Sequence, residues 1–176
     1  MIDKLDTVKT LKRNRLIFDR NVFEHYFDWV VLALLIIIPP AITVFYSLSN
    51  IESFKTDLLG QIISNVLSFG FVFYIISGIR QSFGLHHLKG TSLTDNKDVI
   101  NNIIKNNNWT LYKDCEDYMI IATGRLKSQI NIIFTQNDIV VNSVTFGRND
   151  LISPFFQMRN RENIDKIIEE YKKYAL

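Results

Sequence analysis

Arg20 and His25 form a pair of side chains whose types and spacing could act on a phosphodiester bond. They stand in the stretch Arg20-Asn-Val-Phe-Glu-His25, in which the polar Asn21 directly follows the arginine. A histidine can move a proton in general acid–base catalysis, and an arginine can bind the scissile phosphate through charge-assisted hydrogen bonds. The chemistry that this pair could perform is therefore RNA cleavage.

The stretch resembles the R-x4-H motif of HEPN ribonucleases, in which both side chains act from a helix and the active site needs two copies. Its surroundings argue against a working nuclease. Arg20 lies nine residues before Trp29, where a long apolar segment begins, so the four-helix HEPN body has no room. On a continuous helix the two side chains would also lie about 140° apart. We therefore expect that the protein is not an enzyme and that Arg20 and His25 are not catalytic.

Residue counts exclude other kinds of chemistry. The 20 Lys and Arg against 18 Asp and Glu leave a net charge of +2, too small to indicate a nucleic-acid partner. Cys115 is the single cysteine, so no intramolecular disulfide can form, and the histidines His25, His86 and His87 show no zinc-like spacing to it. We expect no metal site, no cofactor and no direct contact with nucleic acid.

Two long uncharged segments, residues 29–51 and 58–79, hold much of the apolar content. As a helix, the 23 residues of the first segment span roughly 34 Å, and the hydrocarbon core of a bilayer is about 30 Å thick. Trp29 and Tyr46 suit the aromatic belts of membrane interfaces. Buried core helices are the alternative, but such helices rarely run about 20 residues without a charge. We therefore expect two transmembrane helices.

The distribution of positive charge predicts the orientation in the membrane. Six Lys or Arg precede the first segment, whereas the connecting loop, residues 52–57, carries only Lys55. The positive-inside rule then places both termini in the cytoplasm, with the protein multi-pass in a bacterial inner membrane. The polar stretch before the first segment lacks Ala-x-Ala cleavage chemistry, so it is not a cleavable signal peptide.

Pro39 and Pro40 fall in the middle of the first segment. Each proline removes a backbone hydrogen-bond donor, so the pair predicts a kink or a break in the helix. Membrane helices tolerate such a site where neighbouring groups or water satisfy the freed carbonyls. The kink either serves helix packing or bends the helix to shape a vestibule or a gate.

The second segment carries a polar stripe along one side. At 100° per residue, five small or amide side chains fall within about 140° of the helix surface. They are Gly60, Gln61, Ser64, Asn65 and Ser68. Polar amides inside a membrane must face protein or water, so the stripe is either a helix–helix interface or the lining of an aqueous pore. One hairpin cannot enclose a pore, and a pore therefore requires a ring of copies.

Residues 80–176 are typical of a small α+β unit on the cytoplasmic side. One helix is predicted to begin at Thr94, and a final helix to cover residues 161–175, each with one apolar face. Four strand candidates are residues 109–113, 118–123, 128–134 and 139–144. We expect a three- or four-stranded antiparallel sheet covered by helices.

The leader, residues 1–28, has the pattern of a basic amphipathic helix. If residues 4–27 are helical, apolar side chains share one face and charged side chains fill the other. Such a helix lies in the lipid headgroup region or packs on a partner helix. The chain then divides into this leader, a two-helix hairpin over residues 29–79 and the α+β unit over residues 80–176. The expected fold class is a membrane α-helical hairpin plus α+β.

The chain resembles one family in its motif and in its architecture. The motif is Arg20, Asn21 and His25, and the architecture is two spans followed by an α/β tail. This family comprises the small membrane accessory proteins of subtype VI-B CRISPR systems, encoded beside an RNA-guided RNA-targeting effector. The resemblance covers the architecture of the full chain. It implies a homo-oligomeric membrane pore that enhances antiviral defence by permeabilising or depolarising the inner membrane. The implied partners are further copies of the chain, the bilayer and, by function, the effector.

A membrane-anchored binding module is the alternative function. A hairpin of two spans followed by a small β-rich unit also resembles bacterial anchored sensors and toxin-immunity proteins. In that case the hairpin only anchors the chain, and the cytoplasmic unit binds a protein or a lipid. The size of the particle in detergent separates the two functions, because a pore requires a large closed ring.

Overall fold

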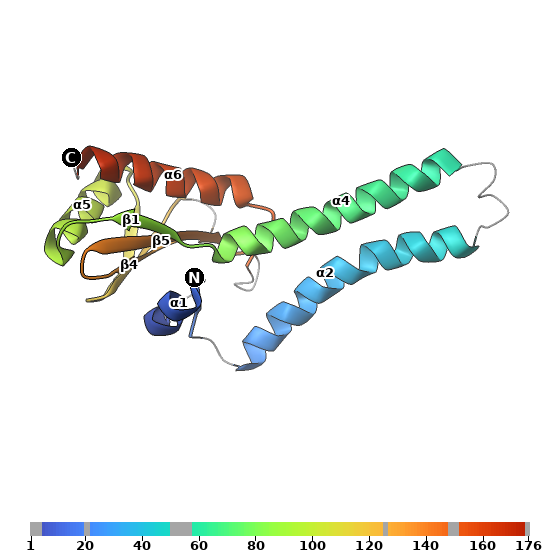
Figure 1. Ribbon diagram of the computed structural model, residues 1–176, viewed down its shortest axis with the longest axis horizontal. Helices are drawn as coiled ribbons and strands as arrows, with labels where there is room; N and C mark the ends of the chain where they lie inside the picture. The colour runs from blue at the N-terminus through green and yellow to red at the C-terminus, as the bar shows by residue number, and fades with distance from the viewer. Residues whose placement is uncertain (1–4, 20–21, 50–57, 125–126, 148–151, 175–176) are drawn as a thin grey trace.

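The computed structural model describes residues 5–19, 22–49, 58–124, 127–147 and 152–174. Within these residues the fold is α+β, with five helices and one antiparallel sheet of five strands. Figure 1 shows the sheet and its covering helices at one end, with α2 and α4 projecting from it as a long hairpin. The helices are α1 (Thr7–Arg13), α2 (Val22–Ser49), α4 (Leu58–Phe83), α5 (Leu93–Asn106) and α6 (Gln157–Tyr174). The strands are β1 (His86–Lys89), β2 (Thr110–Asp114), β3 (Tyr118–Ala122), β4 (Ser128–Phe134) and β5 (Asp138–Thr145).

The sheet has the order β1-β5-β4-β3-β2, and every neighbouring pair is antiparallel. The four predicted strands are confirmed as β2 to β5. The expectation of three or four strands is wrong, because β1 adds a fifth strand at the edge beside β5. β1 is only four residues long and mostly exposed. Its sequence, His-His-Leu-Lys, has neither the apolar run nor the alternation that marks a strand.

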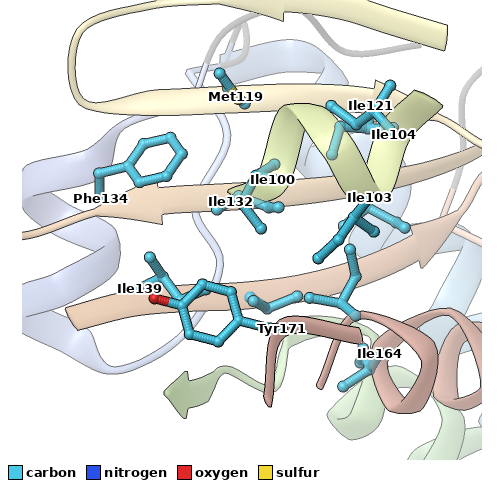
Figure 2. Close-up of a cluster of buried hydrophobic side chains, with 13 residues drawn as sticks. Ile100, Ile103, Ile104, Met119, Ile121, Ile132, Phe134, Ile139, Ile164 and Tyr171 are labelled. Carbon is cyan, nitrogen blue, oxygen red and sulfur yellow. The ribbon is translucent and has the colours of Figure 1, made fainter. Parts of the chain in front are cut away.

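One face of the sheet is covered by α5 and α6, and we name it the α5/α6 face. Alternate side chains of the central strands point to this face and meet one apolar stripe from each helix. Figure 2 shows these side chains gathered between the strands and the helices. The buried residues are Ile100, Ile103, Ile104, Met119, Ile121, Ile130, Ile132, Phe134, Ile139, Val141, Ile164, Ile167 and Tyr171. Beside this apolar cluster, the same face holds a buried polar patch of Ser128, Ser143, Thr145 and Asn160, with hydrogen bonds from Thr145 to Ser128 and Asn160 and from Asn163 to Ser128 and Ser143.

The two helices predicted for this region are confirmed, with different starting residues. α5 begins at Leu93 because the hydroxyl oxygen of Ser92 accepts a hydrogen bond from the Asp95 amide and caps the helix. α6 begins at Gln157, four residues before its predicted start. Both predicted apolar stripes lie buried against the sheet.

The opposite face of the sheet, which we name the α4 face, is covered by the N-terminal segment (residues 5–19) and by the end of α4. The buried residues here are Leu5, Leu16, Tyr118, Ile120, Ile133, Val140, Val144, Phe146 and Ile152. Phe83 and Leu85, at the end of α4 and just beyond it, pack against the same cluster. This face therefore joins three parts of the chain that are distant in sequence.

The expected continuous helix over residues 4–27 is wrong. α1 ends one residue before Asn14, which adopts the left-handed conformation (φ 48°) that commonly closes a helix. Leu5 and Leu16 are buried in the core of the α4 face, and Leu5 forms a β-bridge with Phe18. Because packing on the sheet requires this path, tertiary contacts override the helical periodicity of the sequence.

The two long helices are largely uncovered by the rest of the protein. Val30–Leu48 and Leu59–Phe83 are long and apolar enough to cross a membrane, and little of either segment is buried. A core helix of a soluble protein would bury most of its apolar residues. α2 begins before residue 29 and α4 continues past residue 79, so both helices extend beyond the predicted limits of the hairpin.

α2 remains helical through Pro39 and Pro40. The Thr43 hydroxyl lies 3.2 Å from the Pro39 carbonyl oxygen and 2.9 Å from that of Pro40, and it can donate to either. Figure 1 shows that α2 bends near its middle. The prolines therefore bend the helix without breaking it, and a role of the bend in gating stays a prediction.

Candidate functional site at the junction of hairpin and sheet

Four buried side chains follow one another along α4 at seven-residue intervals: Gln61, Ser68, Ile75 and Ser82. Seven residues return an α-helix to nearly the same azimuth, so the four side chains form one line. α2 packs along α4 in the hairpin, and β5 packs against α4 near the sheet. The buried line therefore connects the interior of the hairpin with the sheet.

The five residues of the predicted polar stripe differ in how deeply they are buried. Gln61 is 6% exposed and Ser68 is 8% exposed, and neither Gln61 Oε1 nor Ser68 Oγ has a hydrogen-bond partner among the described residues. Asn65 Nδ2 donates to the main-chain oxygen of Gln61 at 2.9 Å. Ser64 is exposed and Gly60 is half-buried. Two of the five residues thus face the inside of the hairpin, and the role of the stripe as interface or pore lining stays a prediction.

A buried ladder of amides crosses the α4 face and ends on α4. Gln129 Nε2 donates to Asn131 Oδ1 at 2.6 Å, and Asn131 Nδ2 donates to Asn142 Oδ1 at 3.2 Å. Asn142 Nδ2 in turn donates to the carbonyl oxygens of Ser82 (2.9 Å) and Gly84 (2.7 Å). Carbonyls at the end of a helix have no partner within the helix, so the Asn142 amide caps α4 from the sheet.

The turn before α6 holds α4 from the other side. Tyr74 Oη donates to the Phe155 carbonyl oxygen at 3.3 Å, and Gln157 Nε2 donates to the Tyr74 carbonyl oxygen at 3.0 Å. Gly78 faces this turn so closely that a Cβ atom there would lie 2.3 Å from the Pro154 carbonyl oxygen. A glycine is therefore required for the helix and the turn to approach this closely.

The N-terminal segment completes the junction. The Leu16 amide donates to the Phe83 carbonyl oxygen at 3.0 Å, which satisfies another carbonyl at the end of α4. The Thr7 hydroxyl donates to Asp117 Oδ2 at 2.6 Å, at the turn between β2 and β3. The end of α4 is thus enclosed by the N-terminal segment, the amide ladder and the turn before α6.

Charged and titratable groups form no catalytic cluster in the described part of the chain. Lys9 hydrogen-bonds the Asp6 carboxylate at 2.8 Å and holds the pKa of Asp6 below its ordinary value. Burial raises the pKa of Tyr118 on the α4 face and of Tyr171 on the α5/α6 face. Among the described residues, no group of three His, Cys, Asp or Glu side chains could hold a metal ion.

The side chains of the R-x4-H pair fall outside the part of the chain that the structure describes. Arg20 lies outside the described residues, and His25 lies in α2 with a side chain that is also outside them. A role for this pair therefore stays a prediction. His87 on β1 has a structural contact, since its Nε2 lies 3.0 Å from Asn14 Oδ1 at the end of α1.

An apolar hollow of about 230 Å³ lies on α2 beside its bend. Its lining residues are Val31, Leu34, Leu35, Ile38 and Pro39. Ligand sites for polar molecules contain a few convergent polar groups, which this lining does not offer. The hollow fits a hydrocarbon chain or an apolar side chain better than a polar substrate.

Comparisons with protein-family models, with curated proteins and with solved structures found no match for this chain. Sequence reasoning missed the amide ladder, although Asn131 and Asn142 each interrupt a strand of Ile and Val. Asn is depleted in strands, so these two positions carried a signal that a buried polar contact was present.

Proposed function

We propose that the protein is a membrane-anchored binding module, in which α2 and α4 cross the bilayer and carry the α+β unit on its cytoplasmic side. The observation that carries this proposal is the continuity of α4. One unbroken helix runs from the exposed apolar segment that begins at Leu59 to Phe83, which packs against the core of the α4 face. A flexible linker would let the two parts move independently, whereas this helix makes the anchor and the unit mechanically continuous.

The exposure of the hairpin supports the membrane part of this proposal. Large apolar side chains cover the outside of both helices, and a contiguous apolar surface of this kind is costly in water. The excess of Lys and Arg before α2, against a single Lys in the loop, supports cytoplasmic termini. The sheet unit then lies on the same side as both termini.

Cysteine labelling tests this arrangement. In a Cys115→Ser background, Ser53→Cys should react with a membrane-impermeant thiol reagent added to intact cells. Lys89→Cys, at an exposed position of β1, should react only after the cells are opened. Labelling of Lys89→Cys in intact cells would overturn the topology, and loss of the protein from the membrane fraction would overturn anchoring itself.

A homo-oligomeric pore is a second candidate, favoured by the unpartnered polar atoms of Gln61 and Ser68 inside the hairpin. A buried polar group without a partner is destabilising, and water or a neighbouring copy would supply one. As a pore, the protein would support RNA-targeting antiviral defence, the role that the family resemblance implies.

Matched substitutions on α4 test the pore. Gln61→Met and Ser68→Ala remove the buried polar atoms with little change in volume, and Ser64→Ala is the control on the exposed side. For a pore we expect a large ring in detergent and vesicle permeation that the two buried substitutions reduce and the control does not. A monomer or dimer that does not permeabilise vesicles would exclude the pore and leave the anchored module as the proposed function.

A further inference from the structure

The turn before α6 and the first residues of α6 expose large apolar side chains beside the hairpin. Phe155 is 47% exposed and Met158 is 80% exposed. The Phe155 ring packs against the rings of Phe71 and Tyr74 of α4, with centroids 6.4 Å apart in each case. Figure 1 shows the start of α6 lying beside the part of α4 nearest the sheet. The α+β unit therefore extends an apolar surface along the anchor.

This step rests on the proposed function, in which α4 spans the bilayer. The position of the turn along α4 then gives the depth of the turn in the membrane. A hydrocarbon core of about 30 Å takes up about 20 helical residues, so a core that begins at Leu59 ends near Gly78. Tyr74 lies six residues before Arg80, the first charged residue of α4, or about 9 Å deeper along the axis. Tyr74 lies four residues before Gly78, so Phe155, in contact with Tyr74, is then about 6 Å inside the edge of the hydrocarbon core.

Hydrogen bonding within the turn suits this environment. The carbonyl oxygens of Pro154, Phe155 and Phe156 accept hydrogen bonds from Gln157 Nε2, Tyr74 Oη and the Asn160 amide, respectively. Pro154 has no N–H, and the Phe155 amide donates to Ser153 Oγ at 3.4 Å. An irregular segment near hydrocarbon must satisfy its backbone groups within the protein, whereas a turn in water has no such requirement.

Basic side chains flank the apolar ones. Arg80 lies two residues beyond Gly78, which faces Pro154, and Arg161 lies three residues beyond Met158 on α6. Both arginines are exposed. Apolar side chains next to exposed arginines match the boundary of a bilayer, where acyl chains meet anionic headgroups.

We propose that residues 153–158 form a third membrane contact, separate from the two spans, which seats Phe155 and Met158 at the headgroup–acyl boundary of an anionic bilayer. This contact holds the α+β unit against the membrane at a fixed height. The unit then binds its partner at the membrane surface, with α5 and the C-terminal end of α6 farthest from the hairpin (Figure 1).

Depth-dependent fluorescence quenching tests the contact. Single cysteines in a Cys115→Ser background, at Met158, Phe155, Leu67 and Gln136, are labelled with an environment-sensitive dye. The full-length protein is reconstituted in vesicles of phosphatidylcholine and phosphatidylglycerol. Leu67 is an exposed position within the span, and Gln136 is an exposed position in the β4–β5 turn. Met158 is so exposed that its substitution leaves the fold undisturbed.

We expect dyes at Met158 and Phe155 to be quenched by lipids spin-labelled near the headgroup, and shielded from aqueous iodide at least about threefold relative to Gln136. The dye at Leu67 should respond to lipids labelled deep in the acyl chain. Iodide quenching at Met158 and Phe155 equal to that at Gln136, with Leu67 still lipid-quenched, would overturn the third contact and leave the anchor intact.

Two other outcomes also count against the contact. If Leu67 is itself quenched by iodide and not by lipid, the membrane anchor fails and the third contact fails with it. If Met158 and Phe155 are shielded from iodide but not quenched by any lipid, a protein surface covers the turn, and the bilayer is not its partner.

Discussion

The two faces of the same sheet are covered in different ways. The α5/α6 face is filled mainly by apolar side chains from the central strands and from two amphipathic helices, and its buried polar patch forms hydrogen bonds within the α+β unit and, among the described residues, none to α4. The α4 face combines a smaller apolar cluster with the buried amide ladder that ends on Ser82 and Gly84. Apolar burial is non-directional, whereas an amide that caps a helix specifies where that helix must end. One face therefore stabilises the unit, and the other aligns it with the hairpin.

The largest effect is expected from the adjacent residues Ile132 and Ile133 of β4, which point to opposite faces and are both fully buried. Ile132→Ala should lower the free energy of unfolding of the whole unit by about 2–5 kcal/mol, because it leaves a cavity in the main core. Thermal unfolding in detergent measures this loss. Ile133→Ala should additionally increase hydrogen exchange in residues 5–19. Equal exchange patterns in the two variants would contradict the division between the faces.

Asn142→Leu should cost about 1–3 kcal/mol, because it leaves the carbonyl oxygens of Ser82 and Gly84 buried without their donor. Hydrogen exchange should rise at the end of α4 more than in α5 or α6. Ser143→Ala is the matched control, since Ser143 is the next residue of β5 and hydrogen-bonds Asn163 on the other face. The same exchange pattern in both variants would show that Asn142 does not align the helix.

Gly78→Ala should separate the turn before α6 from α4, because the added Cβ would lie 2.3 Å from the Pro154 carbonyl oxygen. We expect a loss of about 1–3 kcal/mol and faster proteolysis near residues 153–157. Gly70→Ala is the control on the same helix, because a Cβ there has nothing within 4 Å. Gly70→Ala should be neutral or stabilising by up to about 1 kcal/mol. If Gly78→Ala and Gly70→Ala change stability and proteolysis to the same extent, the close approach of α4 to the turn does not depend on the glycine.

The smallest effect is expected from Tyr171→Phe, which removes the hydrogen bond from the tyrosine hydroxyl to Asn96 Oδ1 at a cost of about 1 kcal/mol at neutral pH. Burial, followed by the carboxylates of Asp138 and Asp95, raises the pKa of Tyr171 above 10.0 in the folded state. Its contribution is therefore complete below the unfolded pKa and is lost as the pH rises through the folded pKa. The difference in melting temperature between the two proteins should narrow above pH 10, whereas a constant difference would contradict the raised pKa.

Local patterns in the sequence predicted most of the elements and few of the contacts. The uncharged runs predicted α2 and α4, and the strand at residues 128–134 has the predicted limits. β1 was missed because its partner, β5, lies about 50 residues later and its own four residues carry no pattern. The helix over residues 4–27 was predicted from periodicity alone, which cannot register that Leu16 is buried against a sheet made from the second half of the chain.

The candidate site shows the same division between local and distant information. The sequence singled out Gln61 and Ser68 because their polarity is unusual within an apolar helix. It did not single out Gly78 or Gln157, since a close approach between a helix and a turn has no local signature. Asn142 was visible as an amide within an apolar strand, but its partners on α4 depend on tertiary structure.

The position of the N-terminal segment has a consequence for synthesis on the ribosome. Leu5 and Leu16 are made before the sheet, yet the surface that receives them includes Val140, Val144 and Phe146. At about 5–20 residues per second, the segment waits on the order of ten seconds for that surface to exist. Both long helices are complete within this interval. Leu5 and Leu16 can therefore reach their native contacts only long after they have left the ribosome, when both long helices and the receiving strands have already been made.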